Sequence, residues 1–398
     1  MYPLLETMKI RARGFVMRNL VLLYIGTCVL ALLFQNYYPM FSERRLRSGR
    51  HFLRDRTDIF TFFIIVWTML FSGLRLSYND TIHYIGYFQN AATSLEEHFA
   101  ISSELGFADN PLYYIVEVLV KSVINNYHVW FLLTAWVSCY VAVKFFRRYS
   151  TSFAMSLLLF YAIGTYVMYI AAIKQSIAVA ILMCAIPLAL KKKWIPYYLL
   201  VVLAIMFHTH AFLLLVLPLL MRKPWGKFTW CFAVATLFAM ATYDKTLGAF
   251  MEYAQSIGAN VAAVEVFDGH SVNVIRVIVY GIPPVLALIF RRRLFSNSTD
   301  SENLFMNMSI LSWMILTIGT VEGGNLFARM AGYFEWATAI ALPWMIKKLF
   351  EERSQKIVFA CAAVLYTVYF LYEFSVSKNF NSEYSAMTLW QFIASLFS

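Results

Sequence analysis

The chain has 398 residues, of which 61% are hydrophobic and 14% are charged, with 33 Lys and Arg against 22 Asp and Glu. A soluble globular domain is usually about 45–50% apolar and about 25% charged, whereas the mean hydropathy here is +0.63. This composition excludes a nucleic-acid-binding domain, a secreted disulfide scaffold and an ordinary cytosolic enzyme. It predicts an all-α, polytopic integral membrane protein, in which we interpret the net charge of +11 as positive-inside anchoring.

The apolar segments predict about 11–13 transmembrane helices in a single transmembrane domain over residues 1–398. A helix needs about 20 apolar residues to cross the hydrocarbon core, and fewer when it is broken or flanked by aromatic residues. Segment 111–124 carries Glu117 and Lys121, so we interpret it as a lateral or re-entrant helix. The short pair 195–207 and 211–220 is compatible with a hairpin that does not cross fully. The candidate spans are 20–38, 59–74, 128–146, 153–169, 176–190, 195–207, 211–220, 228–242, 274–290, 304–320, 327–346 and 357–373.

Basic clusters fall on alternate loops from residue 147 onward, and the positive-inside rule places them in the cytoplasm. These clusters cover residues 44–56, 147–148, 191–193, 222–227, 291–293 and 347–356. The opposite face then carries residues 75–127, 170–175, 208–210, 243–273, 321–326 and the C-terminal tail. If segment 111–124 does not cross, the N-terminus lies outside; if it crosses, the N-terminus is cytoplasmic. Six arginines in the first loop against four basic residues before the first span favour an outside N-terminus.

Polar side chains gather at the span ends of this outer face, where an ionisable group is costly and usually faces a cavity or a partner. The candidate catalytic residues are Asp80, Glu104 and His208, and the candidate binding residues are Arg75, Tyr84, Lys174, Gln175, Arg276, Arg329 and Tyr333.

Several of these residues also have a purely structural interpretation. Arg75 and Lys174 could extend to the membrane interface, and Asp80 could cap a helix. Glu117 and Glu335 are expected to be partners for nearby cations. His208 and His210 are two residues apart and would not share a helix face, so a metal pair is not favoured. The five cysteines lie singly in apolar runs and are interpreted as packing residues.

The set as a whole predicts a site for an anionic ligand with an acid or base beside it. Arginine suits phosphate because its planar group donates two parallel hydrogen bonds. A lipid diphosphate places its anionic head at the interface and its tail between helices. A nearby carboxylate could accept a proton from an attacking sugar hydroxyl. This chemistry needs no metal and no other cofactor, and no DxD-like metal pair stands out in the sequence.

Ordered motifs in the chain resemble the EpsG family of bacterial polysaccharide polymerases, which are related in role to the Wzy O-antigen polymerases. The motifs are GLRLSYNDTIHYIGYF from Gly73, ELGF from Glu104, IKQSIAVA from Ile173, KKKW with the later FHTH, and RMAGYF from Arg329. The similarity covers residues 58–350, which leaves an N-terminal span and basic loop at 1–57 and a last span and tail at 351–398. Lys174 stands where the family pattern has an arginine, so the charge is kept but the planar group is lost.

The resemblance implies a glycosyltransferase of the multi-span GT-C-like type in the bacterial inner membrane, with its active face on the periplasmic or extracellular side. It implies the joining of undecaprenyl-diphosphate-linked oligosaccharide repeat units, which serve as both donor and acceptor. At these positions our hypothesis is that Arg276 and Arg329 hold the leaving diphosphate, and that Arg75 and Lys174 assist with the second lipid carrier. Asp80 or Glu104 would be the general base, with His208 as a third candidate. The implied partners are membrane lipid, a flippase and a chain-length regulator, and no nucleic acid.

Two alternatives stay open at this point. An O-antigen ligase-type transfer of finished glycan would use the same cations. A flippase or transporter of lipid-linked oligosaccharide is less favoured, because transporters often contain internal repeats with matching broken helices and none is visible here.

Overall fold

The computed structural model describes residues 23–29, 51–105, 110–243, 271–321, 324–375 and 384–397. The chain divides into two compact units, residues 1–214 with 361–398 (unit 1) and residues 215–360 (unit 2), and each is described by itself. The predicted all-α, polytopic membrane fold is confirmed. Within the described residues, strand structure is limited to β1 (Arg75–Ser77) and β2 (Ser385–Ala386), which pair antiparallel.

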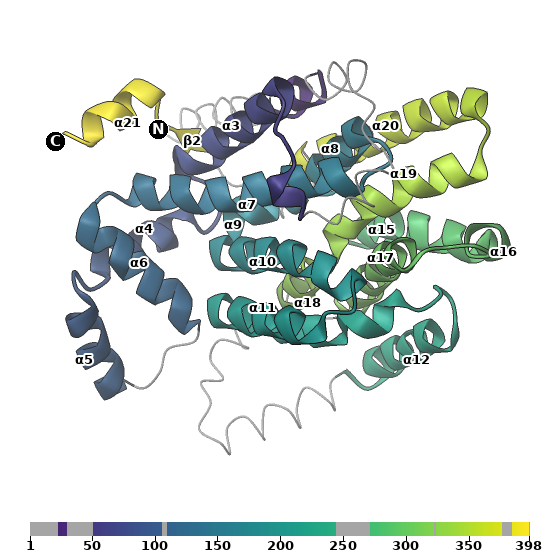
Figure 1. Ribbon diagram of the computed structural model, residues 1–398, viewed down its shortest axis with the longest axis horizontal. Helices are drawn as coiled ribbons and strands as arrows, with labels where there is room; N and C mark the ends of the chain where they lie inside the picture. The colour runs from purple at the N-terminus through teal and green to yellow at the C-terminus, as the bar shows by residue number, and fades with distance from the viewer. Residues whose placement is uncertain are drawn as a thin grey trace, which may run out of the picture. The chain divides into compact units, whose positions relative to one another are not determined.

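The described helices of unit 1 are η1 (Phe52–Arg54), α3 (Ile59–Gly73), α4 (Thr81–Asn90), α5 (Leu95–Leu105), α6 (Pro111–Val123), α7 (Tyr127–Tyr149), α8 (Phe153–Ala162), α9 (Thr165–Ala171), α10 (Ile173–Leu190), α11 (Trp194–Phe207) and α21 (Leu389–Ser395) (Figure 1). Those of unit 2 are α12 (Lys227–Ala241), α15 (Val274–Ile289), α16 (Arg291–Leu294), α17 (Asp300–Ile318), α18 (Gly324–Ala331), η3 (Glu335–Ala337) and α19 (Thr338–Leu349). The division between the units falls within η2 (Thr209–Met221) and α20 (Glu352–Ser375).

Three described helices, α7, α10 and α20, are long and apolar enough to cross a membrane, and the pair α8 and α9 could form one span bent by 54°. Five shorter apolar helices, α3, α11, η2, α12 and α15, have 10–17 residues. The total of 11–13 spans stays a prediction, because several of these helices are too short to cross alone. The predicted first span, 20–38, lies mostly outside the described residues, with residues 23–29 helical.

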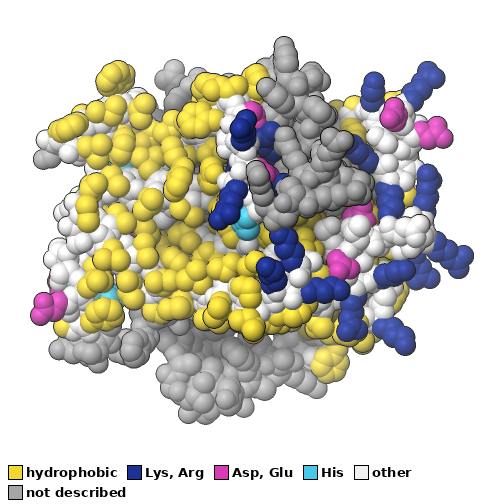
Figure 2. Space-filling model, viewed as in Figure 1, with side chains coloured by type: hydrophobic (Ala, Val, Ile, Leu, Met, Phe, Trp, Pro, Cys, Tyr) yellow, Lys and Arg dark blue, Asp and Glu magenta, His cyan; other side chains and the backbone are white. Residues whose placement is uncertain are grey.

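Exposed apolar side chains identify a lipid-facing surface. On α11, the exposed side chains of Ile195, Leu199 and Val202 follow a helical spacing of four and three residues, while Tyr197 and Val201 on another face are buried. Figure 2 shows broad areas of hydrophobic side chains on the face in view. Such a surface is costly in water and is satisfied by lipid tails.

Helices α3 and α7 lie side by side in unit 1 (Figure 1). The approach is close at Gly73, where an added Cβ would lie 2.4 Å from Cδ2 of Leu132. Asp58 caps the start of α3 by accepting from the backbone N–H of Thr61 at 3.0 Å.

The two ends of unit 1 can be distinguished by their contacts. At one end, Arg148 donates to Asp55 at 2.9 Å and Arg147 pairs with Asp58, which joins two of the predicted cytoplasmic clusters. At the other end, β1 and β2 join residues 75–77 to the C-terminal tail, and Tyr384 donates to the carbonyl of Phe71 at 2.6 Å. Both segments are predicted to lie on the outer face, and the structure places them at one end of unit 1.

Helix α6 begins and ends at that same end of unit 1. Before its first residue, Asn110 accepts from the backbone N–H of Thr209 at 2.8 Å. After its last turn, Asn126 donates to the carbonyl of Ser395 in α21 at 3.2 Å. This placement agrees with the interpretation of segment 111–124 as a helix that does not cross.

Unit 2 is built around α17, against which α12, α15, α18 and α19 pack. The helix begins with a capping box, in which Thr299 and Glu302 bond each other's backbone N–H groups at 3.3 and 2.7 Å. Predicted span 327–346 is interrupted in the structure, because α18, η3 and α19 are separate elements.

Candidate functional site

Lys174 lies at the start of α10, half-buried among three tyrosine rings. Its Nζ donates to the hydroxyl of Tyr114 at 2.7 Å. The same nitrogen lies 4.2 Å from the ring centroid of Tyr114, 4.9 Å from that of Tyr113 and 5.5 Å from that of Tyr87. An ammonium within about 6 Å of an aromatic face is attracted by the ring's negative face. Helices α4 and α6 therefore build an aromatic wall around a cation supplied by α10.

A buried carboxylate, Glu117, lies behind this wall on α6. Its Oε1 accepts from the hydroxyl of Tyr113 at 3.2 Å, and Trp130 donates to the same hydroxyl oxygen at 3.1 Å. Its Oε2 has no hydrogen-bond partner among the described residues. Helix α6 is not among the described helices that are long and apolar enough to cross a membrane. Burial raises the pKa of Glu117 to about 7, against the opposing effects of the Tyr113 hydrogen bond and the charge of Lys174.

Arg75 is buried where α3 gives way to β1. Its Nε donates to the hydroxyl of Thr81 at 3.0 Å, and its Nη1 donates to the carbonyl of Ser72. The guanidinium lies 4.4 Å from the ring centroid of Phe131, and Nη2 has no hydrogen-bond partner among the described residues. Arg75 therefore joins α3 to α4 and keeps one donor nitrogen uncommitted.

The remaining predicted residues of unit 1 lie around these groups. Tyr84 is buried on α4, with its ring centroid 6.4 Å from that of Tyr113. Gln175 is buried beside Lys174 on α10. Tyr84 and Lys174 therefore both lie beside Tyr113, whereas Arg75 lies at the start of β1, just after α3, and the binding roles of these residues stay predictions.

The three candidate bases, Asp80, Glu104 and His208, lie at or near the ends of helices. Asp80 is half-buried at the N-cap of α4, and its carbonyl accepts from Tyr84 N–H at 3.1 Å. His208 ends α11, with its ring centroid 5.1 Å from that of His210. Glu104 lies in α5, and its side chain is outside the described residues. Their catalytic roles stay predictions. In the described part of the chain, no three His, Cys, Asp or Glu residues lie together as a metal site.

In unit 2, Arg276 and Glu335 form a buried ion pair, with Nη2 and Oε2 separated by 3.1 Å. Tyr280 donates to the same carboxylate oxygen at 3.3 Å. The expectation that Glu335 serves as the partner of a nearby cation is confirmed. Tyr333 is fully buried just before η3, and Arg329 lies half-buried in the last turn of α18.

The aromatic wall is the feature that sequence analysis missed. Tyr113 and Glu117 are four residues apart and share one face of α6, so their spacing in the sequence could have predicted the contact between them. The gathering of Tyr87, Tyr113 and Tyr114 around Lys174 is not predicted from the sequence.

These observations define an integral membrane protein whose cations and carboxylates are held in aromatic, largely buried surroundings. The chain belongs to the EpsG family, whose model matches residues 58–388. No curated protein and no solved structure matches the chain. The match begins where the expected core begins and continues through β2. Membership of this family indicates a membrane protein of polysaccharide biosynthesis with a polymerase-like, glycosyltransferase-type function.

Proposed function

We propose that this protein polymerises lipid-linked oligosaccharide repeat units on the outer face of the bacterial plasma membrane. The donor and the acceptor would both be undecaprenyl-diphosphate-linked units. The observation that carries the proposal is the family match over most of the chain.

The geometry of unit 1 supports an anionic, sugar-bearing ligand. The Lys174 ammonium supplies a positive charge, and Tyr87 and Tyr114 offer partly exposed rings beside it. An electrostatic contact strengthens where water is excluded, because the local dielectric is low. A cation flanked by aromatic faces therefore suits a diphosphate whose first sugar packs against a ring.

The proposed reaction is a glycosyl transfer. The acceptor hydroxyl oxygen forms a bond to the anomeric carbon of the donor, and the bond from that carbon to the diphosphate oxygen breaks. The hydroxyl proton passes to a base, for which Asp80, Glu104 and His208 are the candidates. The diphosphate leaves with its bonding electron pair, and nearby cations stabilise the charge that develops on it.

We assign the leaving diphosphate to Arg329, with Arg276 held in a fixed orientation by Glu335. Arg75 and Lys174 are assigned to the second lipid carrier. Arg75 supports this role through its uncommitted Nη2, and Lys174 through its half-exposed position.

The test is the lipid-linked material in a deletion strain. A polymerase deletion accumulates single repeat units on the undecaprenyl carrier, and they are accessible from outside in intact spheroplasts. A ligase deletion accumulates unattached polymer instead. Single units trapped on the cytoplasmic side would identify a transporter and overturn the proposal.

A further inference from the structure

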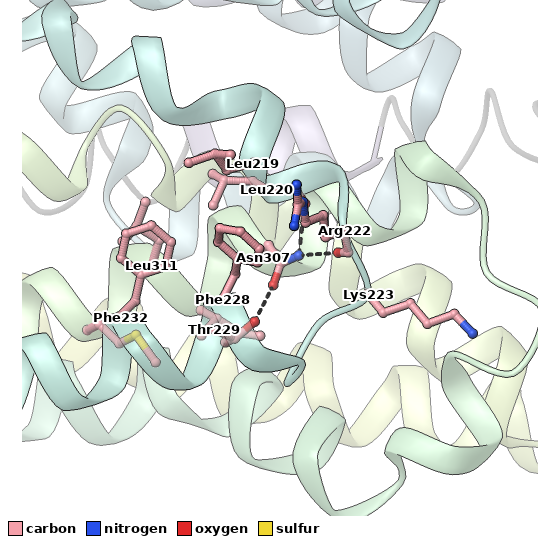
Figure 3. Close-up of a pocket in the computed structure, with 11 residues that line it drawn as sticks. Leu219, Leu220, Arg222, Lys223, Phe228, Thr229, Phe232, Asn307 and Leu311 are labelled. Atoms are coloured by element: carbon pink, nitrogen blue, oxygen red, sulfur yellow. Dashed lines mark hydrogen bonds between the residues drawn. The ribbon is translucent and has the colours of Figure 1, made fainter.

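Unit 2 contains a narrow hollow between the end of η2, the start of α12 and one side of α17 (Figure 3). Its walls are mainly apolar, and its rim carries two exposed cations, Arg222 and Lys223. The space between atoms is about 290 Å³, part of which is open to the outside. The hollow is therefore a shallow apolar groove with a basic rim, and it is too small to enclose an oligosaccharide.

The basic rim is held rigidly by α17. The buried side chain of Asn307 donates to the carbonyls of Leu220 at 2.8 Å and Arg222 at 2.7 Å, and it accepts from Thr229 at 3.2 Å (Figure 3). Asn303, one turn earlier on α17, donates to the carbonyl of Met221 at 3.4 Å.

The indole of Trp225 anchors the far side of the same loop by donating to the carbonyl of Pro284 at 3.1 Å. Positive-inside anchoring requires only charge in a loop. It does not require four side-chain hydrogen bonds that hold the loop on which the charges stand. The fixed loop is the observation that separates this cluster from an ordinary basic turn.

The guanidinium of Arg222 is directed by stacking. Its Cζ lies 4.0 Å from the ring centroid of Phe228, which is itself a lining residue. A guanidinium that stacks by its face on an aromatic ring can still donate hydrogen bonds from the N–H groups at its edge. The planar arrangement of these N–H groups matches the oxygens of a phosphate. Lys223 extends outward from the rim and adds a second charge (Figure 3).

From these features, we propose that the hollow binds one anionic phospholipid of the cytoplasmic leaflet, with its phosphate on Arg222 and the first part of an acyl chain against Phe228, Phe232 and Leu311. Charge complementarity identifies the head group, because basic pockets between helices on the cytoplasmic side bind anionic lipid heads. The apolar wall identifies a lipid over a free anion. This site is independent of the proposed polymerase reaction.

The test uses the full-length protein, purified in detergent and stripped of lipid. Phosphatidylglycerol or phosphatidylcholine is then added, and bound lipid is counted by native mass spectrometry. We expect retention of phosphatidylglycerol over phosphatidylcholine, and a loss of about tenfold in the Arg222→Gln/Lys223→Gln variant, which corresponds to about 1.4 kcal/mol.

Two further variants test whether the loss of phosphatidylglycerol is specific to this hollow. Lys192→Gln/Lys193→Gln removes two exposed charges from the basic turn between α10 and α11, and it should bind as the wild type does. Leu311→Trp fills the hollow without changing charge, and it should lose phosphatidylglycerol as the double charge variant does.

Equal binding by the wild type and the Arg222/Lys223 variant would overturn the proposal. Equal losses in the two lysine-containing double variants would also overturn it, because binding would then depend on net charge alone. Displacement of the lipid by millimolar inorganic phosphate would show a site for free anions instead. Matching melting temperatures in detergent without lipid show that each variant is folded.

Discussion

Arg276 and Glu335, 59 residues apart in the chain, meet as a buried ion pair in unit 2, with their nitrogen and oxygen 3.1 Å apart. Tyr280, one turn after Arg276 on α15, donates to the same oxygen. A buried charge is tolerated only when it is paired and hydrogen-bonded. The pair therefore holds Arg276 charged and oriented within an apolar unit.

Removing one partner of this pair should destabilise the protein. Glu335→Gln leaves Arg276 buried without its counter-charge, a change that costs about 3–5 kcal/mol in soluble proteins. We expect a lower melting temperature in detergent and a reduced amount of protein in the membrane.

The double variant Arg276→Met/Glu335→Gln separates stability from function. It removes both charges, so it should recover most of the lost melting temperature while failing to make long polymer. Full polymerisation by this variant would show that Arg276 has only a structural role.

The positive charge of Lys174 should be required for the synthesis of long-chain polysaccharide. Lys174→Met keeps the aliphatic packing among the tyrosines but removes the cation, and it should reduce long-chain polysaccharide by roughly 10- to 100-fold. Lys174→Arg keeps the charge and should retain most of the product. Both are measured by chain-length gel, with immunoblots of the membrane fraction to equalise protein. Wild-type chains from Lys174→Met would remove this residue from the site.

Glu117 should make stability depend on pH. Its pKa rises from 4.5 to about 7 on burial, so between these values the folded state binds more protons than the unfolded state. The free energy of unfolding should therefore fall as pH rises from about 4.5 to about 7 and level off above that, by a total on the order of 3 kcal/mol. Glu117→Gln should lose this slope when melting temperatures are compared from pH 5 to pH 8.

Glu97→Gln is the matched control for this pH series. Glu97 lies on α5, and hydrogen bonds from Thr93 lower its pKa below 4.5, so it does not titrate in the measured window. It should keep the wild-type slope. Superimposable curves for Glu117→Gln and the wild type would contradict the assignment.

The close approach of α3 and α7 should make Gly73 intolerant of a side chain. In Gly73→Ala, the new Cβ would lie 2.4 Å from Leu132 Cδ2 and 2.9 Å from its Cα, so helices must separate. Overpacking of this kind costs about 1–3 kcal/mol. Gly86→Ala on α4 meets nothing within 4 Å and should be neutral or stabilising. Equal melting temperatures for the two variants would show that the contact is not tight.

Much of the fold was predictable because lipid imposes long apolar segments. Predicted segments 59–74, 128–146 and 274–290 correspond closely to α3, α7 and α15. Breaks within apolar runs were not predictable. Predicted span 153–169 bends by 54° next to Gly164, which has a φ of 80°, and hydropathy carries no information about that conformation. Similarly, residues 209–221 form a 3₁₀ helix although their composition is that of an α-helix.

The site was predictable in its residue types but not in its pairings. The cost of ionisable groups in apolar segments singled out Arg276 and Lys174 as candidate binding residues, and Glu117 as the expected partner of a cation. Their partners depend on tertiary packing: Glu335 is far along the chain, and the tyrosines around Lys174 come from two other helices. Aromatic residues are common in membrane proteins, so composition alone did not distinguish Tyr87, Tyr113 and Tyr114 from the other aromatic residues of the chain.

The most direct measurement of the central claim is a chain-length gel of surface polysaccharide from a deletion strain, complemented with the wild type, Arg329→Ala or Arg293→Ala. Arg293 is an exposed arginine of α16 and serves as the matched control. We expect long chains with the wild type and Arg293→Ala, and single-repeat material with the deletion and with Arg329→Ala present in the membrane. Normal chain length in the deletion strain would contradict the polymerase assignment. Long chains from Arg329→Ala would contradict the role of Arg329 in holding the leaving diphosphate.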